Sequence, residues 1–384
     1  MENRFDILKI SETLADIIDD YILVCKPDGG IIFSNSSMQS NLGYDDIELK
    51  QKNFLDVIAD THINKAESFI KNASEKPSGW KEFLFDGKHG LTKLHIKVLQ
   101  KNDLIYIYGN EKYAEYERIR KKLDIEITNA IKIHKQSLPD SLPSAENISF
   151  ASLYIPAQDL GGDIFDVFKV DNGLLNDYFE QYVCFIADVS GHGLDSAMLA
   201  IFVKDTINSY FRLKHIPGQV LSPKEIMHFF VEHYMKEGYP MEYLVCIFFI
   251  VFDLKTDELT YCNAGFHMCP ILVADKDNIM ELNKGGLPVS TALDAELYDY
   301  KDHSLQLSPN MTLFIMSDGL PEQRFCNEFY ENRLKKLIPE IYNLKPVDII
   351  QKIHEDFNKF LKYEKINDDI TLIVVKLSEH GNNV

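Results

Sequence analysis

The sequence predicts an α+β protein in which two domains are joined by a long helix, and three observations lead to this prediction. The chain has 384 residues, more than one typical hydrophobic core contains. Residues 112–138 include neither glycine nor proline and are rich in charge, which is typical of a long helix. Apolar strands separated by turns lie on both sides of this segment, with helical stretches among them.

Residues 11–111 are expected to form a small α+β domain. The stretch YILVCKPDGGIIFSN at 21–35 predicts two strands around a Pro-Asp-Gly-Gly turn, and a helical stretch follows. In residues 80–110, apolar and polar residues then alternate in runs separated by turns, which is typical of a three-stranded meander. This order resembles a PAS sensor domain, and the pattern of that family is present at Asp28, Gly29, Ile31, Asn35, Gly43, Tyr44 and Glu48. The resemblance assigns no ligand, so the PAS ligand is unknown.

Residues 112–138 predict the connecting helix, which ends before Pro139. Apolar or semi-apolar residues recur along it with a period of ~3.67, which fits an eleven-residue repeat and a nearly straight or weakly right-handed pairing. These positions are Tyr116, Ile119, Leu123, Ile127, Ala130, His134 and Leu138. We expect a dimeric coiled coil here, and therefore a homodimer. The alternative is a single amphipathic helix that packs on a neighbouring domain.

Residues 146–378 predict a second, larger domain with long apolar strands and two helical segments. Residues 243–274, for example, contain a strand, an acidic turn and two further strands. Strands of this length with helices between them favour a layered α/β/β/α sandwich.

Acidic residues stand at strand ends in four places of this second domain. Asp163 follows two glycines, Asp188 and Asp318 each follow an apolar run, and Asp368 and Asp369 immediately precede one. Buried carboxylates are costly unless they are neutralised, and no arginine or lysine flanks these. Hard divalent cations prefer carboxylate oxygens. Any one motif could be a simple turn, but together they predict a dinuclear metal site.

The order of the motifs GGDxxD, DVSGHG, NAGFH, SDGLPE and DDITL is similar to that in the metal-dependent PPM/PP2C serine/threonine phosphatases, in particular their bacterial SpoIIE/RsbU branch. The stretch QSLPDSLP at 136–143 is similar to the lead-in of that branch. The resemblance implies an α/β/β/α sandwich with two Mn²⁺ or Mg²⁺ ions at one end of the sheets.

The resemblance also implies a set of metal ligands. Asp188 would bridge both ions, and the backbone carbonyl of Val189 would help to hold one of them. Asp318 and Asp368 match ligands of the other motifs, and Asp163 would hold the second ion directly or through water.

Three further positions follow from the same resemblance. Asp369 ranks below Asp368 as a ligand, because relatives often carry asparagine there. His192 matches the position suspected of protonating the leaving group, and the alternative is that it fixes the turn by hydrogen bonding. His267 stands one residue late in its motif, which leaves its contact open. No arginine of the kind that grips phosphate in eukaryotic relatives occurs in Ser149–Gly162.

The implied activity is that of a protein phosphatase regulated by the PAS-like domain. A water activated by two ions would attack the phosphorus in line, without a covalent phosphoenzyme. In this branch the usual substrate is a phosphorylated STAS-domain anti-anti-sigma factor. The alternatives are a catalytically inactive phosphatase fold that serves as a scaffold, and a signalling or dimerisation module.

Composition limits the partners and the compartment. The formal net charge of −19 argues against nucleic acid and against an anionic membrane as the main partner. The N-terminus lacks the apolar core of a signal peptide, and the longest apolar run, Tyr243–Phe252, is far shorter than the ~20 residues of a membrane span. The six cysteines include no CxxC pair, so free thiols in the cytoplasm are expected.

Overall fold

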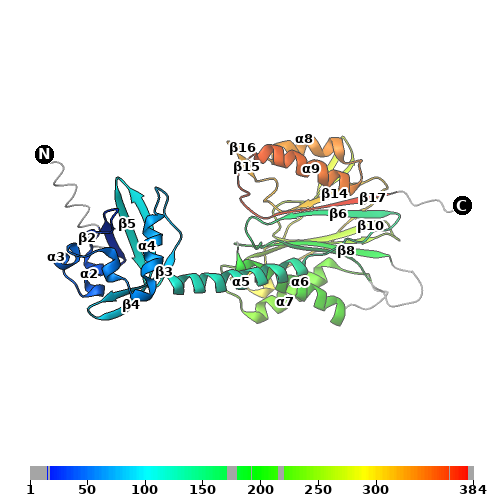
Figure 1. The fold of residues 1–384 in the computed structure, drawn as a ribbon. Helices are drawn as coiled ribbons and strands as arrows, with labels where there is room; N and C mark the ends of the chain where they lie inside the picture. Colours follow the sequence, from blue (N-terminus) through cyan, green and yellow to red (C-terminus); the bar gives the residue numbers. More distant parts are fainter. Residues whose placement is uncertain are drawn as a thin grey trace. The chain divides into compact units, whose positions relative to one another are not determined.

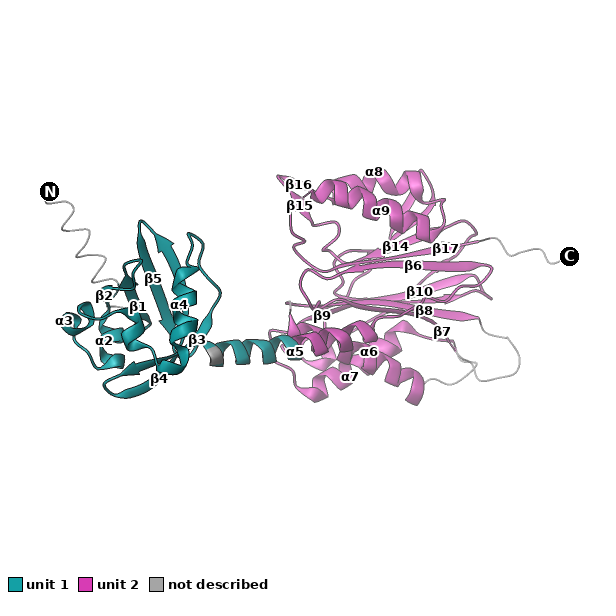
Figure 2. Cartoon of the chain, in the orientation of Figure 1, with its two compact units in different colours: residues 1–126 teal, residues 127–384 magenta. Residues whose placement is uncertain are grey.

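The computed structural model describes residues 15, 18–170, 180–191, 193–214, 220–362 and 364–378. The chain divides into two compact units, residues 1–126 and 127–384 (Figure 2). The division falls within helix α5 (Tyr113–Ser137), so each unit is described separately. The finer domain limits given by the sequence, 11–111, 112–138 and 146–378, stay predictions.

Unit 1 contains one five-stranded antiparallel sheet. The strand order is β2-β1-β5-β4-β3, so the hairpin at the start of the unit lies beside the meander at its end. The strands are β1 (Tyr21–Cys25), β2 (Ile31–Ser34), β3 (Lys81–Gly87), β4 (Gly90–Lys101) and β5 (Leu104–Asn110). A hairpin, helices and a meander therefore occur where the sequence predicts them, while the assignment of the unit as a PAS domain stays a prediction.

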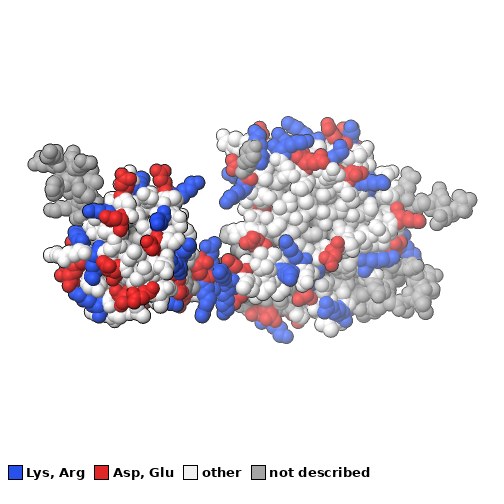
Figure 3. Space-filling model, in the orientation of Figure 1, with Lys and Arg blue, Asp and Glu red and all other residues white. Residues whose placement is uncertain are grey.

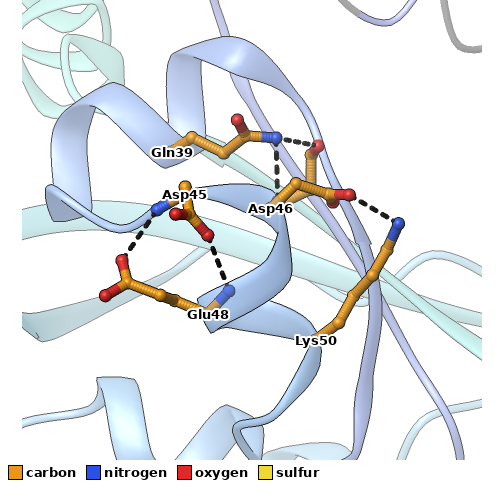
Figure 4. Close-up of polar contacts among 6 residues, drawn as sticks. Gln39, Asp45, Asp46, Glu48 and Lys50 are labelled. Atoms are coloured by element: carbon orange, nitrogen blue, oxygen red, sulfur yellow. Dashed lines mark hydrogen bonds and ion pairs between the residues drawn. The ribbon is translucent and has the colours of Figure 1, made fainter.

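Short helices connect β2 to β3 and close the apolar core of unit 1. Side chains cap the N-termini of α2, α3 and η1, and the capping box of α3 is drawn in Figure 4. Asp45 accepts a hydrogen bond from the N–H of Glu48 at 2.8 Å, and the Glu48 carboxylate accepts one from the N–H of Asp45 at 3.1 Å. Gln39 donates to the backbone oxygen of Ser34 at 2.9 Å. The helices are α2 (Ser36–Leu42), α3 (Asp46–Lys50), η1 (Phe54–Val57), η2 (Asp60–His62) and α4 (Ile63–Lys71).

Unit 2 is a four-layer sandwich of two antiparallel sheets between pairs of helices (Figure 1). The first sheet has the order β13-β10-β9-β8-β7 and is covered by α6 (Leu194–Leu213) and α7 (Pro223–Glu237). The second has the order β12-β11-β14-β17-β6 and is covered by α8 (Glu331–Ile341) and α9 (Pro346–Leu361). The predicted α/β/β/α architecture is confirmed.

The strands of unit 2 pair throughout as antiparallel neighbours. They are β6 (Ile148–Ile155), β7 (Ile164–Lys169), β8 (Gln181–Val189), β9 (Val245–Asp253), β10 (Glu258–Ala264), β11 (Ile271–Asp275), β12 (Asn278–Glu281), β13 (His303–Gln306), β14 (Thr312–Met316) and β17 (Ile370–Leu377). A short helix η3 (Ala295–Leu297) and a small hairpin of β15 (Arg324–Phe325) and β16 (Glu328–Phe329) complete the unit.

The central strands are apolar along their whole length because both of their faces are buried. In β9, Phe248 packs between the two sheets, whereas its neighbour Phe249 packs under α6 and α7. In β14, Ile315 faces the space between the sheets and Phe314 faces α8 and α9. Strands covered on both sides read as continuous apolar runs rather than as an alternating pattern.

The predicted number of helical segments in unit 2, two, was too low. The described residues of this unit contain four α-helices after α5. For α8, a local signal argues against a helix. Pro339 lies inside α8, and proline inside a periodic segment normally indicates a helix end. Among the described helices, none combines the length and the apolar character that crossing a membrane requires.

The amphipathic stripe predicted for the linker helix has two different environments along α5. Tyr116, Ile119 and Leu123 are exposed by 60%, 56% and 52%, respectively. Further along, His134 is only 3% exposed, and Leu138, just beyond the helix, packs against both apolar cores of the sandwich. The last turns of α5 therefore match the alternative given above, in which one face of a single helix packs on the neighbouring domain.

We expect Asp45→Ala to destabilise unit 1 by about 1 kcal/mol, because it removes the side-chain cap of α3. Trp80, the only tryptophan of the chain, stacks on Tyr113 within unit 1, so its fluorescence during urea unfolding of the full chain reports on this unit. The control is Lys50→Ala, which removes only the exposed pair with Asp46 and should cost about 0.3–0.5 kcal/mol. Equal effects of the two variants would contradict the assigned importance of the cap.

Candidate active site

The acidic motifs meet where strand ends from both sheets come together. In the first sheet, Ile164 at the start of β7 pairs with Ala187 near the end of β8, which brings Asp163 close to Asp188. In the second sheet, Met316 at the end of β14 pairs with Leu372 near the start of β17. The segments that carry Asp318, Asp368 and Asp369 are therefore neighbours as well.

A hydrogen bond connects the acids of the two sheets. The hydroxyl of Thr371 on β17 donates to Oδ2 of Asp163 at 2.6 Å, and Asp163 is only 2% exposed. Burial, followed by the negative charge of Asp188, raises the pKa of Asp163 well above its usual range. The structure thus places Asp163 in the group of acids, with its orientation fixed from the opposite sheet.

Asp188 lies at the centre of this group electrostatically. Burial raises its pKa to about 7, and the charges of Asp318, Asp368 and Asp369 add to the effect. Val189, the next residue, is fully buried, and its carbonyl oxygen lies close to Gly162. A Cβ atom at position 162 would stand 2.6 Å from that oxygen, so only glycine allows this approach.

Asp318 is half-buried and lines an open pocket at the same end of the sheets. Burial raises its pKa, and the charges of Asp368 and Glu322 raise it further. The pocket is lined by Asp318, Gly319, Glu322, Gln323, Arg324, Asn367 and Asp368.

The two neighbouring acids of the last motif differ in their surroundings. Asp369 is buried, and its carboxylate accepts hydrogen bonds from the N–H groups of Ala157 at 2.8 Å and Gly162 at 2.6 Å. Asp368 is exposed beside the pocket, and its Oδ1 accepts from the N–H of Asp369 at 2.8 Å. In this arrangement Asp369 fixes the loop that carries Asp163, while Asp368 faces the pocket.

The two histidines that the sequence indicates differ in what the structure shows of them. His192 lies outside the described residues, so its assignment stays a prediction. His267 lines a second pocket together with Met268, Glu322 and Arg324, and its charge opposes the rise in the pKa of Asp318. His267 therefore lies near the acids, although the sequence left its contact open.

The donor chemistry of this site fits divalent cations. Among the described residues, none of Asp163, Asp188 and Asp318 forms an ion pair with lysine or arginine, and burial followed by the charges of nearby carboxylates raises the pKa of each. Carboxylate oxygens are the ligands that Mn²⁺ and Mg²⁺ prefer. In the described part of the chain, no three histidine, cysteine, aspartate or glutamate side chains are close enough together to hold one ion.

The end of α5 contacts the back of the site. The ring of His134 bonds to the backbone of Gly161, and Nε2 of the same ring has no hydrogen-bond partner among the described residues. Burial lowers the pKa of His134, and the charge of Asp369 partly offsets this. Lys204 of α6 donates to the backbone oxygen of Ser137 at 2.5 Å and pairs with Asp166 of β7 at 2.7 Å.

Comparisons with known proteins give a consistent result. The family model for stage II sporulation protein E (SpoIIE) matches residues 180–378. The chain is 25% identical over 269 residues to phosphoserine phosphatase RsbU of Bacillus subtilis (strain 168), covering 69% of this chain and 74% of RsbU. It is 23% identical over 207 residues to phosphoserine phosphatase RsbP of the same organism, covering 53% of this chain and 46% of RsbP. The chain thus spans less than half of RsbP.

Two solved structures share the fold of unit 2. The SiaA-PP2C domain of Pseudomonas aeruginosa has a TM-score of 0.56 and 16% identity, covering 68% of this chain and 99% of that chain. The structure of the RsbU and RsbW domains of Rv1364c from Mycobacterium tuberculosis has a TM-score of 0.50 and 20% identity, and 63% of each chain is covered.

We expect the metal-free protein to lose stability as the pH rises from about 4 to about 7. The folded state binds the proton of Asp188 more tightly than the unfolded state does, because its pKa is raised from 3.8 to about 7. Stability therefore falls across this interval and stays low above it. Asp188→Asn should flatten this part of the pH profile.

Thermal melting followed by circular dichroism in the presence of a chelator, at several pH values, measures this effect. Asp275→Asn is the control, because Asp275 is exposed and stands at the other end of the second sheet from Asp318. If wild type and Asp188→Asn showed the same pH dependence, the electrostatic account of the site would be wrong.

Proposed function

The chain belongs to the SpoIIE family, and from this premise we propose that it hydrolyses phosphoserine or phosphothreonine on a protein with the help of two Mn²⁺ or Mg²⁺ ions. The observation that supports this most directly is the crowding of carboxylates from both sheets at one strand-end site. Burial, followed by the charges of neighbouring carboxylates, raises the pKa of Asp163, Asp188 and Asp318, and none of the three pairs with a lysine or arginine in the described part of the chain. A cation is the simplest way to balance that charge.

The ligands that the resemblance implies are part of this proposal, and the placement of the acids supports them. Asp188, the carbonyl of Val189, Asp318 and Asp368 would hold the ions, with Asp163 on the second ion directly or through water. Such ions, when bound, lower the pKa of a water molecule and offset charge on the phosphoryl oxygens. Thr371 orients Asp163 through its hydrogen bond. His192 stays the candidate for protonating the leaving oxygen.

Asp369 belongs to this proposal mainly as a positioning residue. Its carboxylate already accepts hydrogen bonds from the N–H groups of Ala157 and Gly162. These bonds hold the loop before Asp163 against the start of β17. As the sequence predicts, we rank it below Asp368 as a ligand.

The proposed substrate is a phosphorylated STAS-domain anti-anti-sigma factor. The names of the relatives RsbU and RsbP identify them as phosphoserine phosphatases, which supports phosphoserine as the group that is hydrolysed. On the face drawn in Figure 3, acidic and basic side chains are interspersed over both units. With a net charge of −19, the chain is suited to a neutral or basic partner and not to nucleic acid. A cytoplasmic location is part of the proposal, and all six cysteines are free thiols.

A catalytically inactive scaffold is the second candidate, and one observation favours it. No three potential ligands converge on a single point among the described residues. A scaffold of this fold would not require metal for binding a partner, whereas a phosphatase of this kind would require it for turnover. The dependence on metal therefore separates the two candidates.

We expect Asp188→Asn and Asp318→Asn each to lower Mn²⁺-dependent hydrolysis of p-nitrophenyl phosphate by ~100-fold or more, because each removes a charge that holds an ion. Circular dichroism should show that both variants stay folded. Asp275→Asn is the matched control and should keep full activity. Near wild-type turnover by either site variant at saturating Mn²⁺ would disprove the ligand assignment, and a wild type inactive with both metals would favour the scaffold.

Regulation by unit 1 is proposed to act through α5, because the end of this helix contacts the site. His134 bonds to the loop that precedes Asp163, and Lys204 connects the last turn of α5 to α6 and β7. Helix α6 begins at Leu194, shortly after Asp188. A displacement of α5 would therefore reach both Asp163 and Asp188.

The exposed part of the same helix is the proposed dimer contact. We expect Leu123→Glu combined with Ile127→Glu to weaken a homodimer formed through residues 113–138 and to uncouple turnover from unit 1. The control is Asn129→Glu with Gln136→Glu, which adds the same two charges to exposed polar positions of α5. Light scattering and activity measured on the full chain give both readouts. A monomeric wild type, or an unchanged double variant, would mean that α5 only connects the units.

A further inference from the structure

Arg324 places a positive charge beside the acids. It lies after Asp318 in the sequence, not before Asp163, where eukaryotic relatives carry an arginine that binds phosphate. It begins the small β15–β16 hairpin, six residues after Asp318. Arg324 lines the same pocket as Asp318, Asp368 and Glu322. Among the described residues that line this pocket, Arg324 is the only one with a cationic side chain.

The hairpin that carries Arg324 is anchored to the site. Gln323, only 1% exposed, donates to the backbone oxygens of Arg324 at 3.3 Å and Lys365 at 3.2 Å. Its Oε1 also accepts from the N–H of Asn367 at 3.0 Å. This buried amide ties the base of the hairpin to the segment that leads into Asp368. The position of Arg324 relative to the acids is therefore fixed by the fold.

In the part of the chain that the structure describes, the guanidinium of Arg324 has an aromatic contact but no acidic partner. Its central carbon lies 4.5 Å from the centroid of the Phe329 ring, a cation–π contact across the hairpin. Among the described residues it forms no ion pair, whereas Arg333 on α8 pairs with Asp356 at 3.3 Å. The N–H donors of Arg324 are thus not used to neutralise a carboxylate of the pocket.

We propose that Arg324 binds the phosphoryl group of the phosphoserine or phosphothreonine substrate, an inference that rests on the proposed function. A phosphate ester carries negative charge and would be repelled by Asp318, Asp368 and Glu322. A planar guanidinium can donate two parallel hydrogen bonds to phosphate oxygens, which makes arginine well suited to this contact. Ser149–Gly162 contains no arginine that could bind phosphate. Arg324, which follows Asp318 in the sequence, supplies that contact instead.

The surroundings of Arg324 also suit a protein substrate. Arg324 and Glu322 line a second pocket together with His267, Met268, Pro321, Phe329 and Glu331. The guanidinium therefore lies between the acids and a partly apolar surface. A polypeptide on that surface would present its phosphorylated side chain to Arg324.

The test compares Arg324→Gln and Arg324→Lys with Arg333→Gln, a matched loss of one exposed arginine in the same unit. With Mn²⁺ and a phosphoserine peptide, Arg324→Gln should raise KM ~10-fold or more, because a charge-assisted hydrogen bond is lost. The constant for inhibition by inorganic phosphate should rise by a similar factor. Arg324→Lys should recover part of the loss, since it restores the charge but not the planar pair of donors. Arg333→Gln should match wild type in both measurements.

Two further measurements distinguish phosphate binding by Arg324 from a purely structural role of this residue. Titration with Mn²⁺ followed by calorimetry should give the same metal affinity for wild type and Arg324→Gln, and their melting temperatures should agree. An unchanged phosphate inhibition constant would overturn the proposal. So would a changed Mn²⁺ affinity or a lowered melting temperature that accounts for the loss, because Arg324 would then support the acids or the hairpin.

Direct calorimetry with inorganic phosphate separates this inference from the proposed function. If wild type hydrolysed nothing but bound phosphate in an Arg324-dependent way, the proposed reaction would fail and the binding assignment would stand. If wild type were active and its phosphate affinity did not depend on Arg324, the proposed reaction would stand and the binding assignment would fail.

Discussion

Repulsion among carboxylates is the constraint on which the candidate site depends. Asp163, Asp188 and Asp318 come from strand ends in both sheets, and burial together with neighbouring charge raises the pKa of each. Such a group costs stability unless bonds or cations offset the charge. The protein supplies part of the offset through the Thr371 hydroxyl and through the backbone groups that hold Asp369. The remaining charge is what the proposed divalent cations would balance.

The layers of unit 2 make this concentration of charge possible. The core strands are buried on both faces, as Phe248 and Phe249 on β9 illustrate, so their ends are fixed by packing on two sides. Register then decides which ends meet, because the pairs Ile164–Ala187 and Met316–Leu372 bring the acids to one end of the sheets. A slip of one residue would turn every side chain of a strand to the opposite face. The apolar core therefore holds the polar site in place.

Helix α5 shows how one periodic pattern can serve two purposes. Its first half leaves Ile119 and Leu123 exposed, while its last turn buries His134 behind the loop that leads to Asp163. Lys204 adds a second connection, from the end of α5 to the strand that follows Asp163. Contacts of this kind connect the end of α5 to the site, while the first half of the helix keeps apolar side chains exposed.

The sequence by itself determined the strands, the linker helix and the acids at strand ends, because each depends on local patterns of apolar, charged and turn residues. It did not determine three features that rest on distant contacts: the burial of His134, the hydrogen bonds of Asp369, and the place of Arg324. Asp369 and Ala157, for example, bond across 212 positions of sequence. The segment before Asp163 contains no arginine for phosphate, whereas folding brings Arg324 to the pocket from after Asp318. Local patterns indicate which elements form, but only the packing and register of the two sheets decide which side chains meet.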